Sequence, residues 1–340
     1  MVHLHLSTLD LTKMRFAYSP LWETVMGYRA MRDSSRFAIH LPWVCEAQQA
    51  TTGLDLGLLS TVVQPRGYIP DFVTPPPVTA LPEFEHEIAA LLSTPAETVR
   101  REIALLLEEL PQHLHGQLEV FKSNPQDVLL RLADQLRLYW STALEPHWPR
   151  LRAMLENDIL LRARSLALGG ATALFSDLNP LLRFADGILS LDQSLCSGEH
   201  GNVDLGGRGL LLMPSAFVWP RLSTILGAPW QPTLAYTARG VANLWINEPP
   251  QVAHSLELLL GQGRAQVLLS LEPPSSTLEI ARRLGLVTSG VSEHLSVLRS
   301  SGLVESQRRG RFVYYRLSQT GAALLELLGT HHQPLEAASS

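Results

Sequence analysis

The sequence has only two cysteines, Cys45 and Cys196, in 340 residues. A scaffold held together by several disulfides is therefore excluded, and the low cysteine content suits a reducing compartment. No apolar run approaches the roughly 18–20 residues that a transmembrane helix needs. The first ten residues, MVHLHLSTLD, lack the basic start and apolar core of a signal peptide. We therefore expect a cytoplasmic protein that has no membrane partner.

Sequence motifs of common enzymes are also missing. There is no G-x-S-x-G and no P-loop, and GGRG at 206–209 lacks the spacing and following helix of a dinucleotide-binding fingerprint. HEIAA at 86–90 begins like the helix of a zinc protease but has no second histidine. Cys196, His200 and Asp204 lie in a glycine-rich segment with no fourth metal ligand nearby, which favours a plain loop. We expect no enzyme, no metal and no cofactor.

Positive charge is scarce in most of the chain but not at its C-terminal end. The net charge of −5 excludes a protein that binds polyanions over its whole surface. Residues 254–330, however, hold eight arginines and six glutamates. Five of these arginines lie within 288–317, TSGVSEHLSVLRSSGLVESQRRGRFVYYRL. The excess positive charge therefore lies at the C-terminal end, and it is modest.

Length and composition predict two folded domains. Hydrophobic residues make up 46% and charged residues 17%, and 340 residues exceed one typical core. All seven tryptophans precede the proline-containing segment NEPPQ at 247–251, which we take as the domain joint. We predict an α+β protein, mainly α. A large α+β domain spans 1–249, a small C-terminal domain spans 250–330, and a tail spans 331–340.

Local signals predict several elements of the large domain. VHLHL at 2–6 alternates like a strand, and Ser19 is placed to cap a helix that begins at Pro20. Proline-rich residues 65–82 predict a surface loop. Helical spacing begins at Asn124 and is interrupted by Pro146 and Pro149, and a second helix is expected to stop at Gly169-Gly170. Asp186-Gly187 predicts a hairpin.

The segment SSTLEIARRLG predicts the first helix of a helix-turn-helix. Ser276 followed by Glu279 is a capping-box pattern. The expected apolar face consists of Leu278, Ala281 and Leu284. Residues 285–287 then form a tight turn that leads into a second helix.

The second helix is expected at about 289–301, with Thr288 or Ser289 as its cap and Gly302 just after its end. Its inward row consists of Val291, Leu295 and Leu298. The opposite face is polar and mostly small, and consists of Ser289, Ser292, Glu293, Ser296 and Arg299. Such a narrow face suits a helix that lies in a DNA major groove. His294 lies beside the apolar row, where a histidine is more often structural.

A basic hairpin is predicted after this helix, at about 304–317. Val313, Tyr315 and Leu317 are expected on the inner face of its returning strand. Arg308, Arg309 and Arg311 cluster at the tip. A hairpin of this kind beside a helix-turn-helix is a wing, whose arginines can contact phosphates or a narrow minor groove.

Three segments, STLEIARRLGL, VSEHLSVLRSSGLV and RRGRFVYYRL, together resemble the ArsR-type winged-helix transcription regulators over roughly 254–328. The resemblance implies a dimeric DNA-binding protein whose reader is the helix near 289–301. It also implies dimer contacts from flanking helices at about 252–261 and 319–329. The long N-terminal part, with SPLWETV and VDLGGRGLLLMPSAFVWP among its motifs, resembles an uncharacterised domain of bacterial regulators and implies no ligand.

The chain departs from the metal-sensing members of that family. These carry Cys-x-Cys on the helix before the reader, whereas STLEIARRLG has no cysteine, histidine or aspartate. Other members sense zinc through spaced ligands in the last helix, a spacing that His331, His332 and Glu336 do not reproduce. We expect no metal sensing, and an inducer, if there is one, to be organic and to act through residues 1–246.

We predict a sequence-specific DNA-binding transcriptional regulator, a repressor, that binds double-stranded DNA at an imperfect inverted repeat as a homodimer. The candidate DNA contacts are Thr288, Ser289, Ser292, Glu293, His294, Ser296, Arg299, Arg308, Arg309 and Arg311. The large domain is assigned to effector binding or dimerisation. The alternative is a winged-helix protein whose large domain is a protein-interaction or enzymatic module.

Overall fold

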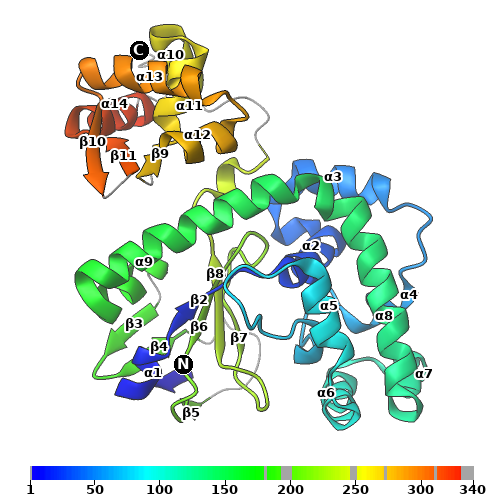
Figure 1. Ribbon diagram of the computed structural model, residues 1–340. Coiled ribbons are helices and arrows are strands. Elements are labelled where there is room, and N and C mark those ends of the chain that lie inside the picture. Colours follow the sequence, from blue (N-terminus) through cyan, green and yellow to red (C-terminus); the bar gives the residue numbers. More distant parts are fainter. Residues whose placement is uncertain are drawn as a thin grey trace, which may run out of the picture. The chain divides into compact units, whose positions relative to one another are not determined.

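Figure 1 shows the computed structural model, which describes residues 2–179, 182–192, 201–245, 251–271, 274–309 and 312–330. The chain divides into two compact units, Met1–Trp245 and Ile246–Ser340, called the N-terminal and C-terminal units below. Both units combine helices with small sheets and helices predominate, so the predicted fold class is confirmed. Four of the five residues of the predicted joint, 247–250, lie outside the described residues.

Helices make up most of the N-terminal unit. They are α1 (Thr8–Thr12), α2 (Pro20–Arg32), α3 (Leu41–Ala50), α4 (Gly57–Val62), α5 (Phe84–Leu92), α6 (Ala96–Glu109), α7 (Gln112–Ser123), α8 (Pro125–Tyr139) and α9 (Trp148–Leu178). Ser19 caps α2 as predicted, because its hydroxyl accepts from the Trp22 amide at 2.8 Å. The predicted loop at 65–82 is held down by Phe72, which is fully buried.

Short 3-10 and π-helical segments lie between and after these helices. They are η1 (Ser34–Arg36), η2 (Ala38–His40), η3 (Asp71–Val73), a π-helical turn (Trp140–Leu144), η5 (Glu145–His147) and η7 (Val241–Asn243). No helix in the described parts of the chain is long and apolar enough to cross a lipid bilayer.

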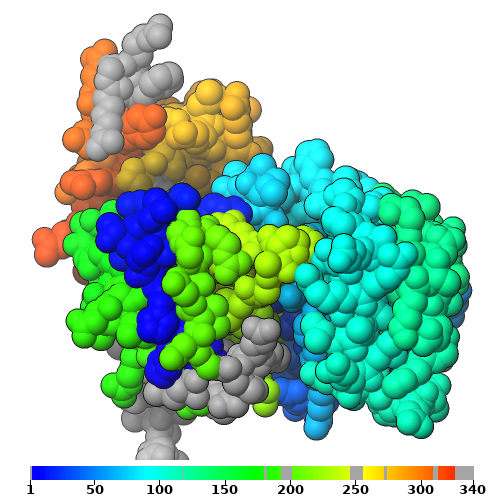
Figure 2. All heavy atoms as spheres, turned by 90° about the horizontal axis from the view of Figure 1, so that it is seen from below, coloured from blue at the N-terminus to red at the C-terminus, as the bar shows by residue number. Residues whose placement is uncertain are grey.

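Two four-stranded sheets complete the N-terminal unit. The first has the order β3-β4-β1-β5 and contains β1 (Val2–His5), β3 (Leu182–Ala185), β4 (Ile188–Leu191) and β5 (Asn202–Asp204). The second has the order β2-β6-β8-β7 and contains β2 (Arg15–Phe16), β6 (Leu211–Ser215), β7 (Ser223–Ile225) and β8 (Thr233–Thr237). Because β1 pairs with β4, the blue N-terminal segment lies against green residues in Figure 2. The predicted hairpin turn is confirmed, with φ of 53° at Asp186 and 75° at Gly187.

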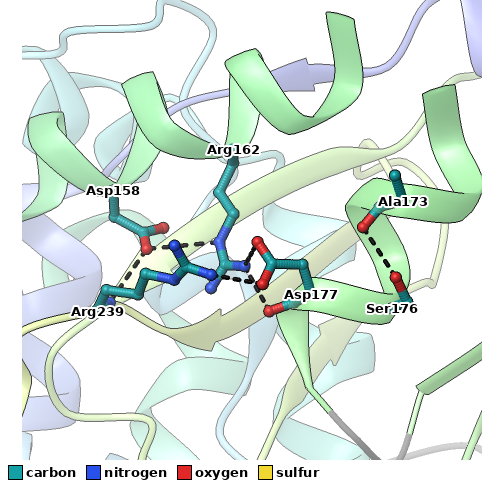
Figure 3. Close-up of polar contacts among 6 residues, drawn as sticks. All are labelled: Asp158, Arg162, Ala173, Ser176, Asp177 and Arg239. Carbon is teal, nitrogen blue, oxygen red and sulfur yellow. Dashed lines mark hydrogen bonds and ion pairs between the residues drawn. The ribbon is translucent and has the colours of Figure 1, made fainter. Parts of the chain in front are cut away.

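Helix α9 bends at Gly170, whose φ of 67° is left-handed. The sequence predicted that the helix would end at this glycine, but it resumes and continues to Leu178. A polar network, buried at Asp158 and Arg162, spans the bend, as Figure 3 shows. Arg162, before the bend, contacts Asp158 at 3.5 Å and Asp177, after the bend, at 2.8 Å. Arg239 also contacts Asp177, and this joins α9 to the segment that follows β8.

The C-terminal unit is a winged helix-turn-helix. Its elements are α10 (Gln251–Leu260), α11 (Gln262–Leu269), β9 (Ser275–Ser276), α12 (Thr277–Leu284), α13 (Thr288–Ser300), β10 (Val304–Arg309), β11 (Phe312–Leu317) and α14 (Gln319–Thr330). The apolar face predicted for α12 was partly wrong. Leu278 is 49% exposed, whereas Ile280, two residues on and so on the opposite side of the helix, is fully buried.

Candidate nucleic-acid interface

Local hydrogen bonds fix both ends of α12, and those at its C-terminal end form the turn to α13. The Ser276 amide donates to Glu279 Oε2 at 2.7 Å, and the Glu279 amide donates back to the Ser276 hydroxyl. The hydrogen bonds from the Ser276 amide and hydroxyl lower the pKa of the Glu279 carboxyl. At the other end of α12, Gly285 has a φ of +66°, and the Leu286 amide donates to the Ala281 carbonyl at 3.0 Å. The predicted capping box and tight turn are both confirmed.

Helix α13 begins at Thr288, earlier than a cap at Thr288 or Ser289 would allow. Val287 occupies the N-cap position, and no side chain caps the helix. Thr288 and Ser289 are therefore the first two helical residues, and the prediction that one of them is the cap was wrong. Both side chains are exposed in the first turn of α13. The N-terminal residues of a recognition helix are the ones that contact base edges in helix-turn-helix proteins.

The two faces of α13 are sharply different, as predicted. Val291, Leu295 and Leu298 are buried against the other helices of the C-terminal unit. The remaining predicted contact residues on this helix, apart from His294, are exposed, namely Ser292, Glu293, Ser296 and Arg299. The buried valine and leucines fix the position of the helix, while the serines on the other side keep much of its outer face narrow. That combination permits a close approach to base edges.

His294 does not share this exposed face. It is half-buried, and its ring lies over Gly263 of α11. A Cβ on residue 263 would lie 2.5 Å from His294 Nε2, so the ring occupies the space that a side chain would fill. The structure therefore gives His294 a packing role between α13 and α11. Gly263 was not identified from the sequence, although a glycine inside a helix was the available signal.

The predicted hairpin forms, with Arg308 opposite Val313 and Arg309 opposite Phe312. Arg308 is exposed, the Arg309 backbone continues β10, and Arg311 lies outside the described residues. Val313 was expected to face inward, but it is 37% exposed. Val313 lies next to the hairpin tip, whereas Tyr315 and Leu317 lie farther from the tip and pack against the hydrophobic core of the unit.

The hairpin is tied to the rest of the C-terminal unit on two sides. Strand β9 pairs with β11, and Arg299 Nη1 donates a long hydrogen bond, 3.4 Å, to the Ser306 hydroxyl. Arg299 therefore links the end of α13 to the hairpin. Arg316 pairs with Glu305 on the opposite strand at 2.8 Å, so its charge is already compensated.

A close contact also sets the position of α14 after the hairpin. The Ser318 amide donates to the Leu303 carbonyl at 3.0 Å, and the Ser318 hydroxyl donates to the Gly302 carbonyl at 2.6 Å. A Cβ on Gly321 would lie only 2.2 Å from the Leu303 carbonyl oxygen. Only glycine allows this approach, and nothing local in the sequence predicted it.

Several residues considered as metal ligands lie outside the described residues, namely Cys196, His200, His331, His332 and Glu336. Within the described ranges, no three histidine, cysteine, aspartate or glutamate side chains come together in a way that could hold a metal ion. Cys45 is a free, exposed thiol.

Comparison with known proteins identifies relatives of the C-terminal unit. The sequence model of a family described as bacterial regulatory protein, arsR family, matches residues 261–306. The HTH-type transcriptional regulator NmtR of Mycobacterium tuberculosis is 38% identical over 76 residues, which are 22% of this chain and 63% of that protein. The transcriptional activator HlyU of Vibrio cholerae is 37% identical over 75 residues, 22% of this chain and 69% of that protein. The chain thus spans about two thirds of the length of these relatives.

Proposed function

The chain belongs to the arsR family of bacterial regulatory proteins, and on this premise we propose that it is a sequence-specific DNA-binding transcriptional regulator. The observation that carries the proposal is α13, a helix with a fully buried apolar row and a narrow, exposed polar face. In this proposal α13 lies in the major groove and the hairpin β10–β11 is the wing. A second role for the C-terminal unit, contact with proteins alone, would not require small side chains on that face.

Individual residues have different proposed roles. Ser289, Ser292 and Ser296 contact base edges, and Glu293 accepts from a cytosine N4 amine. Thr288 and Arg299, at the two ends of the helix, contact the sugar-phosphate backbone. The wing arginines, Arg308, Arg309 and Arg311, contact phosphates. His294 is left out, because its ring packs on Gly263.

We propose that the protein acts as a homodimer on an imperfect inverted repeat. One recognition helix covers few base pairs, and two-fold symmetry would place two of them about 34–36 Å apart. Helices α10 and α14 contact each other, and Leu258 and Leu259 of α10 are 77% and 64% exposed. Two adjacent exposed leucines on a flanking helix support this surface as the dimer contact. Sedimentation should give a dimer, and footprinting should show two protected half-sites.

We propose repression, because a dimer on promoter DNA blocks polymerase without any further contact. The N-terminal unit is proposed to bind an effector or to stabilise the dimer, with no catalytic step. A reporter gene placed behind the selected operator distinguishes the two signs of regulation. Expression that rises when the regulator is deleted supports repression, and expression that falls shows activation.

The test of DNA binding is selection of sequences from a random duplex pool by the full-length protein, followed by affinity measurements. Ser292→Ala should reduce the discrimination between bases at one position of each half-site, with a loss of about 1–3 kcal/mol in the binding free-energy difference. Ser300→Ala, at the opposite end of α13, is the matched control and should leave the preference unchanged. A pool that yields no enriched sequence would contradict the proposal.

A further inference from the structure

A cavity of about 300 Å³ lies in the N-terminal unit, between α2, η1 and two loops. Its polar lining includes four arginines, Arg29, Arg36, Arg66 and Arg221. The first two are close in sequence, but Arg66 follows α4 and Arg221 lies in the loop after β6. None of the described residues that line the cavity is an aspartate or a glutamate. We call this cavity the arginine pocket.

Two of the four arginines already have partners. The Arg29 guanidinium donates from Nε to the carbonyls of Gln64 at 3.0 Å and Pro65 at 3.2 Å. It therefore holds the loop at 64–67 in place, but carbonyls do not neutralise its charge. Arg66 pairs with Asp33 at 3.0 Å.

Arg36 and Arg221 differ from these two. Among the described residues, no side chain or carbonyl forms a hydrogen bond or ion pair with either guanidinium. Arg36 is half-buried and Arg221 is exposed, so both can reach a molecule in the pocket. Guanidinium groups bind carboxylate and phosphate oxygens through paired hydrogen bonds.

The arginines also act on one another. Burial is the main cause that lowers the pKa of Arg29 to about 10; the nearby charges of Arg36 and Arg221 act in the same direction, and Glu109 opposes them. Burial likewise lowers the pKa of Arg36, with Arg221 as the next cause and Asp33 opposing both. Like charges this close repel each other, and an anion between them would relieve the repulsion.

Part of the pocket lining is apolar. Met26, Phe37, Val218 and Leu222 line it and are all buried. The volume is at the lower end of the range for small-molecule sites, about 300–1,000 Å³. The pocket therefore combines a cationic end with an apolar wall and has room for a molecule about the size of one substituted ring.

We propose that the arginine pocket binds a small organic anion, with its carboxylate or phosphate group between Arg36 and Arg221 and its apolar body against Phe37 and Met26. The idea that this anion is an effector rests on the regulatory function proposed above. The idea that the pocket binds an anion does not depend on that function, so binding is tested without DNA. Failure of this inference is therefore distinguishable from failure of DNA binding.

The test is calorimetric titration of the full-length protein with four probes: benzoate, phenyl phosphate, inorganic phosphate and benzyl alcohol. At least one of the two organic anions should bind at millimolar or lower concentration, and its affinity should fall as salt is added. Benzyl alcohol, which lacks the charge, and inorganic phosphate, which lacks the apolar body, should bind at least about tenfold more weakly. Equal binding by either of these two controls, or no binding by both organic anions, overturns the proposal.

Variants then locate the site. Arg36→Gln/Arg221→Gln should weaken binding of the organic anion by about tenfold or more, while Arg36→Lys/Arg221→Lys should restore part of it. Neither arginine has a bonded partner to lose, so the melting temperature should stay near that of the wild type. Arg164→Gln/Arg183→Gln removes the same charge from exposed positions in the same unit and should bind like the wild type. Equal affinity of the wild type and the Arg36→Gln/Arg221→Gln variant would place the anion elsewhere and overturn the assignment.

Discussion

Replacing Gly321 with alanine should destabilise the C-terminal unit, although alanine is the better helix former. The propensity gain from glycine to alanine inside a helix is about 1 kcal/mol. Against it stands the Leu303 carbonyl oxygen, 2.2 Å from the position that the new Cβ would take. A normal carbon–oxygen contact requires roughly 1 Å more. The obstacle is backbone, so it cannot turn aside as a flexible side chain would.

The size of the loss follows from what must move. Shifting the start of α14 by about 1 Å strains the core by roughly 1–3 kcal/mol. It also weakens the hydrogen bonds of Ser318 to the Leu303 and Gly302 carbonyls, each worth about 1 kcal/mol. After subtraction of the propensity gain, we expect Gly321→Ala to lower the free energy of unfolding by about 2 kcal/mol. For a unit of this size that is a fall in melting temperature of roughly 10 °C.

The distribution of tryptophan makes the assay specific. All seven tryptophans lie in the N-terminal unit, so their fluorescence reports the unfolding of that unit, whereas circular dichroism reports both units. Gly321→Ala should lower the melting temperature of one transition seen by circular dichroism and leave the melting temperature seen by fluorescence unchanged. The matched control is Gly290→Ala in α13, where the new Cβ would meet only Val287, at 3.7 Å. That variant should be neutral or up to about 1 kcal/mol more stable. If Gly321→Ala were as stable as the wild type, the argument from the close contact would be refuted.

Three further predictions concern DNA binding, the buried network and pH. Arg308→Gln/Arg309→Gln should reduce the slope of log affinity against log salt by up to about two for every DNA sequence, and equal slopes would exclude phosphate contact by the wing. Arg162→Met should lower the free energy of unfolding, measured by tryptophan fluorescence, by about 3–5 kcal/mol, because the Asp158 carboxylate stays buried without its cation. A loss below about 1 kcal/mol would contradict this. Glu87 is buried, accepts a hydrogen bond from the Leu21 amide, and its pKa is raised by burial to about 8. Between about pH 5 and pH 8 the Glu87 carboxyl is ionised in the unfolded chain and protonated in the folded chain. The free energy of unfolding of the wild type should therefore fall by about 1.4 kcal/mol per pH unit relative to that of Glu87→Gln. Parallel pH profiles of the two proteins would contradict the assignment.

Features that depend on a few neighbouring residues could be predicted from the sequence. The cap at Ser19, the capping box of Ser276 and Glu279, and the left-handed glycines at 285 and 302 involve partners at most a few positions apart. The buried row of α13 follows in the same way, because helical spacing alone puts its three residues on one side. These features were enough to predict the winged helix-turn-helix and its exposed face.

The errors arose where a local pattern met a packing constraint. Leu278 matches a helical apolar face, but the core of the unit covers the side that carries Ile280. Thr288 is a good capping residue, but the turn after Gly285 places Val287 at the cap position. Val313 alternates correctly in its strand, but it lies next to the hairpin tip and is 37% exposed. In each case the pattern was right about the element and wrong about its surroundings.

By itself, the sequence determined the winged helix-turn-helix, the polar face of α13 and the basic hairpin, because these depend on spacings of a few residues. Only the tertiary structure decided that His294 packs on Gly263 and that α14 approaches Leu303 so closely at Gly321. The arginine pocket is the clearest case, since it brings together Arg36 of η1 and Arg221 of the loop after β6. No periodicity connects residues so far apart, because their approach is set by the packing of whole elements around a common core.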